Sequence, residues 1–360
     1  MGSDGDTSGE MFDGRPHKRS TLDLGAGESL WAGLQPDILG AVLRFLPCFA
    51  DRAATRSVCR HWRASARGQR LLPPLPLLML PKLRFSCLCP EGTMTPARCI
   101  QLPEDVATDD VRFVVSFEGW LVGVTPNKDG REYCEKADGA VNDSCIMSLH
   151  KVVVSALPES GAKYIVAASS YHEAHQKLAL RQPRMASWNV CVGFAIDGPI
   201  DIAFYQGKLY VLKRCVLRLF AFELDEDDRG IIVSRVEHCV TEPLHPHPIQ
   251  PCGSIRCNIL VEVFAVDFST NPYGLTEIRS FDGDCIFVDL GGCKSFPASL
   301  YDGLEGDLIY FVPDYFNRYD IFVYNMRDGR MRPFAVNLLP CNSDVPDDYL
   351  DFPAWCFPSE

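Results

Sequence analysis

Four side chains of the kinds that bind zinc lie close together in a proline-rich stretch of the chain. They are His245, His247, Cys252 and Cys257. Imidazole and thiolate groups are common zinc ligands, and a metal ion would hold such a loop in place. Their spacing matches no zinc-finger pattern, however, and histidines that stand between prolines are ordinary exposed loop residues. The sequence therefore favours a loop without a metal ion.

Two other groups of residues invite a chemical interpretation. The acidic run 225–230 resembles a calcium loop, but Arg229 stands at the third ligand position and strand-forming residues flank the run. We interpret it as a charged hairpin tip. Cys87, Cys89 and Cys293 have no neighbours in sequence that would lower a thiol pKa, so we predict packed or turn thiols rather than reactive ones.

The chain also lacks the known catalytic motifs. It contains no phosphate-binding loop, nucleophile elbow, zinc-protease motif or dinucleotide fingerprint. We therefore predict a non-catalytic chain without a cofactor, and an enzyme is the least favoured interpretation. The function must then come from the surfaces that the folded elements present.

The cysteines and the apolar stretches indicate the kind of compartment in which the protein is expected. The sixteen cysteines are scattered singly, with no Cys-x-x-Cys pair, and the N-terminus has no secretory signal. Free thiols in a reducing compartment are the expected state, so we predict a cytoplasmic or nuclear protein. The longest apolar stretch, residues 71–81, contains four prolines and is too short to span a bilayer. We therefore expect no contact with a membrane.

Charge is distributed unevenly along the chain. Residues 44–70 contain seven arginines and one aspartate, a local charge of +6, within a chain whose net charge is −12. The remainder therefore carries −18 and would repel a phosphate backbone, so nucleic acid is not an expected partner. We interpret the arginines as the solvated outer face of short helices.

Those helices are predicted from apolar periodicity. Pro36 and Asp37 suit the first turn of a helix, and Pro47 ends it. A second short helix, capped by Asp51, leads into residues 58–63. About forty residues cannot bury a self-sufficient core, so the surplus apolar face predicts a binding partner. That face of the first helix is formed by Ile38, Leu39, Val42, Leu43 and Leu46.

Residues 31–67 resemble an F-box, with the leucine–proline opening, the acidic residue before paired aliphatics and the closing Val-Cys-Arg-x-Trp-Arg. The resemblance implies docking onto a Skp adaptor and, through it, a cullin. Gln35 replaces a proline of close relatives, and Thr55 replaces a leucine. An ordinary helical hairpin is the alternative. The expected adaptor-binding residues are Leu34, Pro36, Ile38, Leu39, Val42, Leu43, Leu46, Val58, Cys59 and Trp62.

From residue 83 onward, short apolar strands alternate with turn residues. A glycine followed by an apolar strand recurs at 119–122, 207–212, 283–288 and 306–311. At about 40–50 residues per blade, the region would hold about six blades of a β-propeller. A multi-sheet β domain of another kind is the alternative.

A second resemblance concerns this β-rich region. Residues 201–210 are similar to a strand pair of plant F-box proteins that carry a C-terminal KIB-type β-propeller. Four prolines in residues 241–253 cannot join a central strand, so one blade is predicted to be degenerate. Further matching segments are residues 151–155, 280–288, 304–311 and 352–358.

The predicted organisation is an α+β multidomain chain. A disordered tail (1–29) precedes the F-box (30–70), a proline-rich connector (71–82) and the propeller (83–358). The resemblances imply the substrate-recognition subunit of a Skp–cullin–F-box ubiquitin ligase that binds an unidentified protein substrate. The alternative is a propeller scaffold or decoy with a drifted F-box, an interpretation that Gln35 and Thr55 favour.

Overall fold

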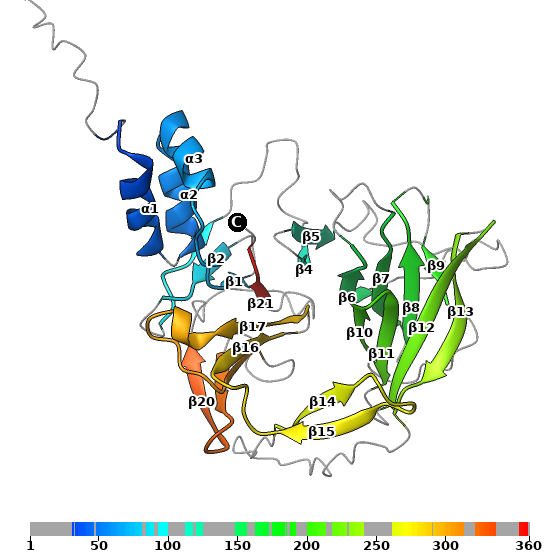
Figure 1. Cartoon of the computed structure of the whole chain (residues 1–360). Helices are drawn as coiled ribbons and strands as arrows, with labels where there is room; N and C mark the ends of the chain where they lie inside the picture. Colours follow the sequence, from blue (N-terminus) through cyan, green and yellow to red (C-terminus); the bar gives the residue numbers. More distant parts are fainter. Residues whose placement is uncertain are drawn as a thin grey trace, which may run out of the picture.

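A computed structural model gives the arrangement of helices and sheets (Figure 1). The residues that it describes are 31, 33–46, 48–80, 84–89, 93–99, 112–117, 120–124, 148–156, 163–172, 175–183, 185, 188–191, 200–213, 218–228, 230–240, 261–289, 291–312, 321–335 and 353–358. The predicted tail and the proline-rich stretch 241–260, which holds the four candidate zinc ligands and the predicted degenerate blade, lie outside these residues.

Three short helices open the described chain: α1 (Pro36–Arg44), α2 (Phe49–Ser57) and α3 (Arg60–Arg67). The chain leaves helical geometry at Cys59, whose thiol accepts a hydrogen bond from the Trp62 amide at 3.4 Å and so caps α3. α3 contacts both α1 and α2. We call these three helices the helical unit.

The first three sheets follow the helical unit. One has the order β21-β1-β2-β3, one pairs β4 with β5, and one has the order β6-β7-β8-β9. Their strands are β1 (Leu77–Leu80), β2 (Arg84–Cys87), β3 (Arg98–Cys99), β4 (Arg112–Phe117), β5 (Trp120–Val124), β6 (Ser148–Val154), β7 (Val166–His172), β8 (His175–Arg181), β9 (Asn189–Val190) and β21 (Ala354–Cys356).

The second three sheets complete the β region. Their orders are β10-β11-β12-β13, β14-β15 and β17-β16-β18-β19-β20. Their strands are β10 (Ile200–Tyr205), β11 (Lys208–Lys213), β12 (Arg218–Asp227), β13 (Gly230–His238), β14 (Val263–Asp267), β15 (Gly274–Ile278), β16 (Asp284–Val288), β17 (Cys293–Pro297), β18 (Leu308–Phe311), β19 (Ile321–Asn325) and β20 (Arg330–Ala335).

The predicted fold class is confirmed: helices come first, and several mainly antiparallel sheets follow. Figure 1 shows the sheets succeeding one another in chain order around a ring. The last described strand, β21, pairs antiparallel with the first, β1, so that the two ends of the β region share one sheet. Such pairing leaves no open edge between the ends of the ring.

The predicted hairpin turn at Gly207 is present, whereas Gly306 has no positive φ and precedes β18, which pairs in parallel with β16. Gln206 and Gly207 both have positive φ, at 46° and 78°, and join β10 to β11 in register. Asp282 and Gly283 also have positive φ, but they lie between β15 and β16, which belong to different sheets. At the tip of the β12–β13 hairpin, Asp227 lies opposite Gly230, so the acidic run is a hairpin tip as predicted rather than a calcium loop.

One part of the predicted organisation needs correction. Residues 77–80, assigned from the sequence to a proline-rich connector, form the fully buried strand β1. Leu78 and Leu80 pack into the main core of the β region, with Trp355 and Phe287. Pro76 and Pro81 flank the four residues 77–80, which have the continuous apolar character of a strand that is buried on both faces.

A half-buried carboxylate holds the closing strand in place. Asp289, in the turn after β16, accepts hydrogen bonds from the backbone amides of Trp355 in β21 and of Gly292, the latter at 2.8 Å. Burial raises the pKa of Asp289 from its ordinary value of 3.8 to about 6, and these amide hydrogen bonds limit the rise. The ring is therefore closed by a carboxylate that titrates above its usual range.

We expect Asp289→Asn to flatten part of the pH dependence of stability. The native state binds more protons than the unfolded chain between pH 3.8 and about 6, so this group makes the free energy of unfolding fall as pH rises through that window. The variant should lack up to about 1.4 kcal/mol per pH unit of that slope. Urea titrations at several pH values measure it.

The exposed carboxylate of Asp302 supplies the control, because Asp302→Asn changes the same side chain at the surface. Asp302→Asn should keep the slope of the unmodified protein. Equal slopes for the unmodified protein and Asp289→Asn would contradict the prediction.

Candidate functional site

The helix α1 carries two adjacent apolar stripes, one buried and one exposed. Leu39 and Leu43 are 0% exposed and pack on Ala66 of α3, which forms the small core of the helical unit. Ile38 and Val42 lie one position earlier on the same helix and are 50% and 42% exposed. One stripe therefore holds the helices together, and the other is open to a partner.

Three more apolar side chains of the helical unit are exposed. Phe45, directly after α1, is 84% exposed, and Val58, directly after α2, is 60% exposed. Trp31, ahead of α1, is also exposed. Large apolar side chains gathered on so small a unit are typical of a protein-binding surface. We call Trp31, Ile38, Val42, Phe45 and Val58 the apolar surface.

The structure sorts the ten predicted adaptor-binding residues into three groups. Leu39 and Leu43 are enclosed, so a partner would reach them only if the helices separated. Leu34, Leu46 and Trp62 are half-buried against that core, and Cys59 is half-buried as the cap of α3. The four that are exposed are Pro36, Ile38, Val42 and Val58.

Sequence reasoning did not select Trp31 and Phe45 for the apolar surface. Neither belongs to the helical spacing that identified the first apolar face, and Phe45 lies in the turn after α1. Their size and aromatic character were the available signal, because large aromatic side chains are enriched where proteins bind one another.

Hydrogen bonds fix the segment before α1 against α3. The indole Nε1 of Trp62 donates to the carbonyl oxygen of Trp31 at 2.6 Å. The ring nitrogen Nε2 of His61 lies 3.0 Å from the carbonyl oxygen of Leu34. These contacts place Trp31 beside α3, so α3 positions one end of the apolar surface.

The helical unit is mounted on the sheet that closes the ring. Cys48, at the N-cap of α2, packs in a buried cluster with Leu77 and Met79 of β1, Cys87 of β2 and Cys356 of β21. The register places Cys87 and Cys356 on either side of Leu77. The first turn of α2 therefore rests on the outer face of this sheet.

Two thiols meet in this contact. A hydrogen bond from Cys87 lowers the pKa of the Cys48 thiol to about 7, and the same interaction, together with burial, raises the pKa of Cys87. Cys87 is a buried, packed thiol, as the sequence predicted. Sequence reasoning did not find Cys48, because its partner lies in a strand rather than nearby in the chain.

A buried arginine reinforces the same junction. Arg52 of α2 is 3% exposed. Its Nε donates to the carbonyl oxygen of Leu46 at 2.6 Å, and its Nη1 donates to that of Leu72 at 2.5 Å. Arg52 thus joins the end of α1, the helix α2 and the chain that leads into β1.

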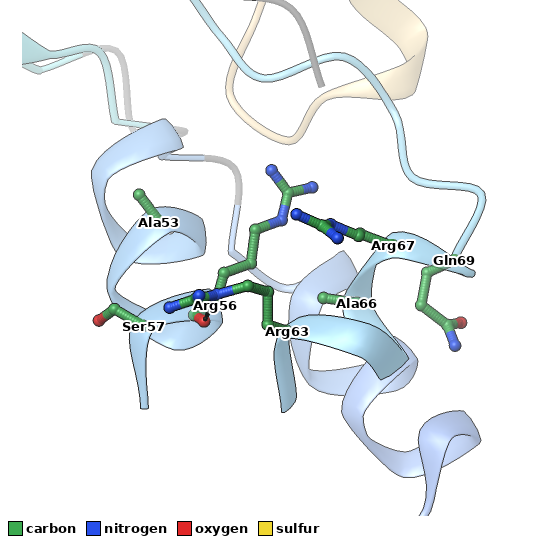
Figure 2. A pocket seen from close by; sticks show the side chains of 7 residues that line it. All are labelled: Ala53, Arg56, Ser57, Arg63, Ala66, Arg67 and Gln69. Carbon is green, nitrogen blue, oxygen red and sulfur yellow. Dashed lines mark hydrogen bonds between the residues drawn. The ribbon is translucent and has the colours of Figure 1, made fainter. Parts of the chain in front are cut away.

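Other arginines of the helical unit surround a hollow between α2 and α3 (Figure 2). Arg56 comes from α2, and Arg63 and Arg67 come from α3. The sequence suggested a simple solvated face for these residues. Arg63 and Arg67 are exposed, as expected, and the structure adds that they line one hollow together with the half-buried Arg56. We call it the arginine hollow.

Metal and membrane sites are absent from the part of the chain that the structure describes. No group of three or more His, Cys, Asp or Glu side chains there is arranged to hold a metal ion. None of the described helices is long and apolar enough to cross a membrane.

Comparison with known families gives one result for the β region. A family model described as KIB1-4 beta-propeller matches residues 85–325. No F-box family model matches the helices. Searches of curated proteins and of solved structures found no match. The match covers more than half of the chain and contains most of the strands described above.

We expect Arg52→Met to loosen the helical unit from the propeller. Methionine keeps the apolar stem but removes the hydrogen bonds that the buried guanidinium makes to Leu46 and Leu72, so the free energy of unfolding should fall by about 2–4 kcal/mol. Urea titration followed by circular dichroism measures the change. Arg60→Met, at an exposed position of α3, should change it by less than about 0.5 kcal/mol. Equal losses in the two variants would contradict this account.

Proposed function

Because the chain belongs to the KIB1-4 β-propeller family, which is typically found with F-box proteins, we propose that it is the substrate-recognition subunit of a Skp–cullin–F-box ubiquitin ligase. The helical unit binds the Skp adaptor, and the propeller binds a protein substrate. The chain itself performs no bond chemistry in this scheme. It is expected to act in the cytoplasm or the nucleus.

The apolar surface carries the proposal. Ile38 and Val42 are exposed although Leu39 and Leu43, their neighbours on the same helix, are fully buried. Burying a valine or isoleucine side chain is worth about 1.5–3 kcal/mol, so a partner that covers this stripe gains substantial affinity. Phe45 adds a large side chain of the kind that often dominates binding energy.

The mounting of the helical unit supports a receptor role. A receptor accelerates ubiquitin transfer by holding substrate lysines near the conjugating enzyme, so the geometry between its two binding regions matters. Cys48 and Arg52 fix α2 to the sheet and to the chain that enters it. The adaptor-binding helices and the propeller then move together rather than on a flexible tether.

The charge of the propeller bears on the substrate. Residues outside 44–70 carry a net charge of −18, and the whole β region lies among them. Complementary charge favours a substrate with a basic surface and speeds its association.

We expect Val42→Asp to weaken adaptor binding by at least tenfold in the full-length chain. The change removes an apolar contact and places a carboxylate in the interface, yet it leaves the buried stripe intact, so thermal stability should stay within about 2 °C. Biolayer interferometry with a purified Skp adaptor measures affinity. Leu43→Ala, one residue away, should instead lower the free energy of unfolding by about 2–5 kcal/mol.

Leu300→Asp is the matched control, because Leu300 is an exposed leucine of the propeller, at 51%. It should bind the adaptor as the unmodified chain does. If the unmodified chain does not bind the adaptor, or if Val42→Asp binds it equally well, the ligase proposal fails. A propeller scaffold with a drifted F-box would then be the better explanation.

A further inference from the structure

We propose that the arginine hollow between α2 and α3 binds an acidic segment of a protein partner. None of the residues that line the hollow belongs to the apolar surface, although Val58 of that surface directly follows Ser57 of the lining. The proposal does not rest on the ligase function, because it requires only that a carboxylate-bearing peptide reach the hollow.

The hollow has the dimensions of a binding pocket. Its volume is about 470 Å³, within the range of pockets that hold organic ligands and larger than a single inorganic oxyanion requires. Small side chains form part of its lining, so acidic side chains have room to enter. The lining residues are Ala53, Arg56, Ser57, Arg63, Ala66, Arg67 and Gln69.

The three arginines of the hollow have no anionic partner among the described residues. Figure 2 shows the side chains of Arg56 and Arg67 reaching toward one another across the hollow. Within the described chain, no carboxylate forms an ion pair with either of them, and the buried Nε atom of Arg56 lacks a hydrogen-bond acceptor. Like charges that converge in this way repel each other, and a bound anion would relieve the repulsion.

The rest of the helical unit does not supply that anion. The acidic residues of its helices are Asp37 and Asp51: among the described residues Asp37 forms no ion pair with the three arginines, and Asp51 lies 3.4 Å from Arg98 of β3. Arg63 is held by a bond from its Nε to the carbonyl oxygen of Arg56, at 3.3 Å. That contact orients the Arg63 side chain but does not neutralise its charge.

The surroundings of the hollow favour a peptide over other anions. Guanidinium groups bind carboxylates through paired hydrogen bonds, and several of them suit a run of acidic residues. Val58, which follows Ser57 of the lining, is 60% exposed and offers an apolar contact beside the charges. A nucleic acid extends its charge along the whole backbone and would meet the acidic remainder of the chain, whereas a short acidic segment need reach only the hollow.

The test uses a fluorescein-labelled hexaglutamate peptide, with a hexaserine peptide of the same length as the neutral probe. Fluorescence anisotropy measures binding to the full-length chain at low salt, because screening weakens exposed ion pairs. The unmodified chain should bind hexaglutamate and not hexaserine. The double variant Arg56→Gln with Arg67→Gln should lose at least tenfold in affinity, since it removes two charged donors.

The matched control is Arg44→Gln with Arg60→Gln, which removes the same charge from exposed positions outside the hollow. It should change affinity by less than twofold. A second pocket variant, Arg56→Lys with Arg67→Lys, keeps the charge but loses the paired donors. It should keep the thermal stability of the unmodified chain and bind several-fold more weakly. A loss of binding in a folded lysine variant shows that the weaker binding does not come from misfolding.

Three outcomes would overturn the proposal. The first is that the unmodified chain does not bind hexaglutamate. The second is that the control double variant weakens binding as much as the pocket variant, which would indicate diffuse attraction. Inorganic phosphate that displaces the peptide at concentrations too low to act by screening would instead assign the hollow to a small anion. Each outcome is independent of adaptor binding, which the Val42→Asp experiment measures.

Discussion

The strand β1 is buried on both faces, and the rest of the structure depends on that double burial. Leu77 and Met79 point to the helical unit and pack near Cys48, whereas Leu78 and Leu80 point into the main core of the β region. Because successive side chains of a strand alternate between its faces, four consecutive apolar residues serve both contacts. Pairing of β1 with β2 and β21 uses its two edges. One short strand thus joins the helices, the first sheet and the returning end of the chain.

The contacts that anchor the helical unit and the exposed apolar stripe belong to different helices. The start of α2 packs on the sheet, and Arg52 ties α2 to the chain that enters β1. The outer stripe of α1, with Ile38 and Val42, remains exposed. Since the helix that is anchored and the helix that carries the exposed stripe are different, a partner can cover α1 without competing with the contacts that hold the helical unit in place.

The sequence predicted those features that depend on residues close together in the chain. It did not predict those that depend on packing between distant elements. The turn at Gln206 and Gly207 was predictable, because a glycine with positive φ acts within a few residues. Periodicity identified α1, but it could not decide which of its two adjacent apolar stripes turned inward, because that depends on the position of α3. The strand β1 was not predicted because the prolines around its continuous apolar run are typical of a connector. The arginine hollow was missed because its side chains come from two helices, whose mutual placement no single-helix pattern records.

The uneven charge of the chain has a consequence for simultaneous binding. The residues from 44 to 70 carry +6, and the remainder carries −18. An acidic partner is attracted to the helical unit and repelled by the propeller, whereas a basic partner is attracted to the propeller and repelled by the helices. The helical unit and the propeller therefore each repel the kind of partner that the other attracts. This repulsion adds to the specificity of both surfaces. A protein that must hold one partner on its helices and another on its propeller benefits from this opposition, because neither partner then competes for the other's surface.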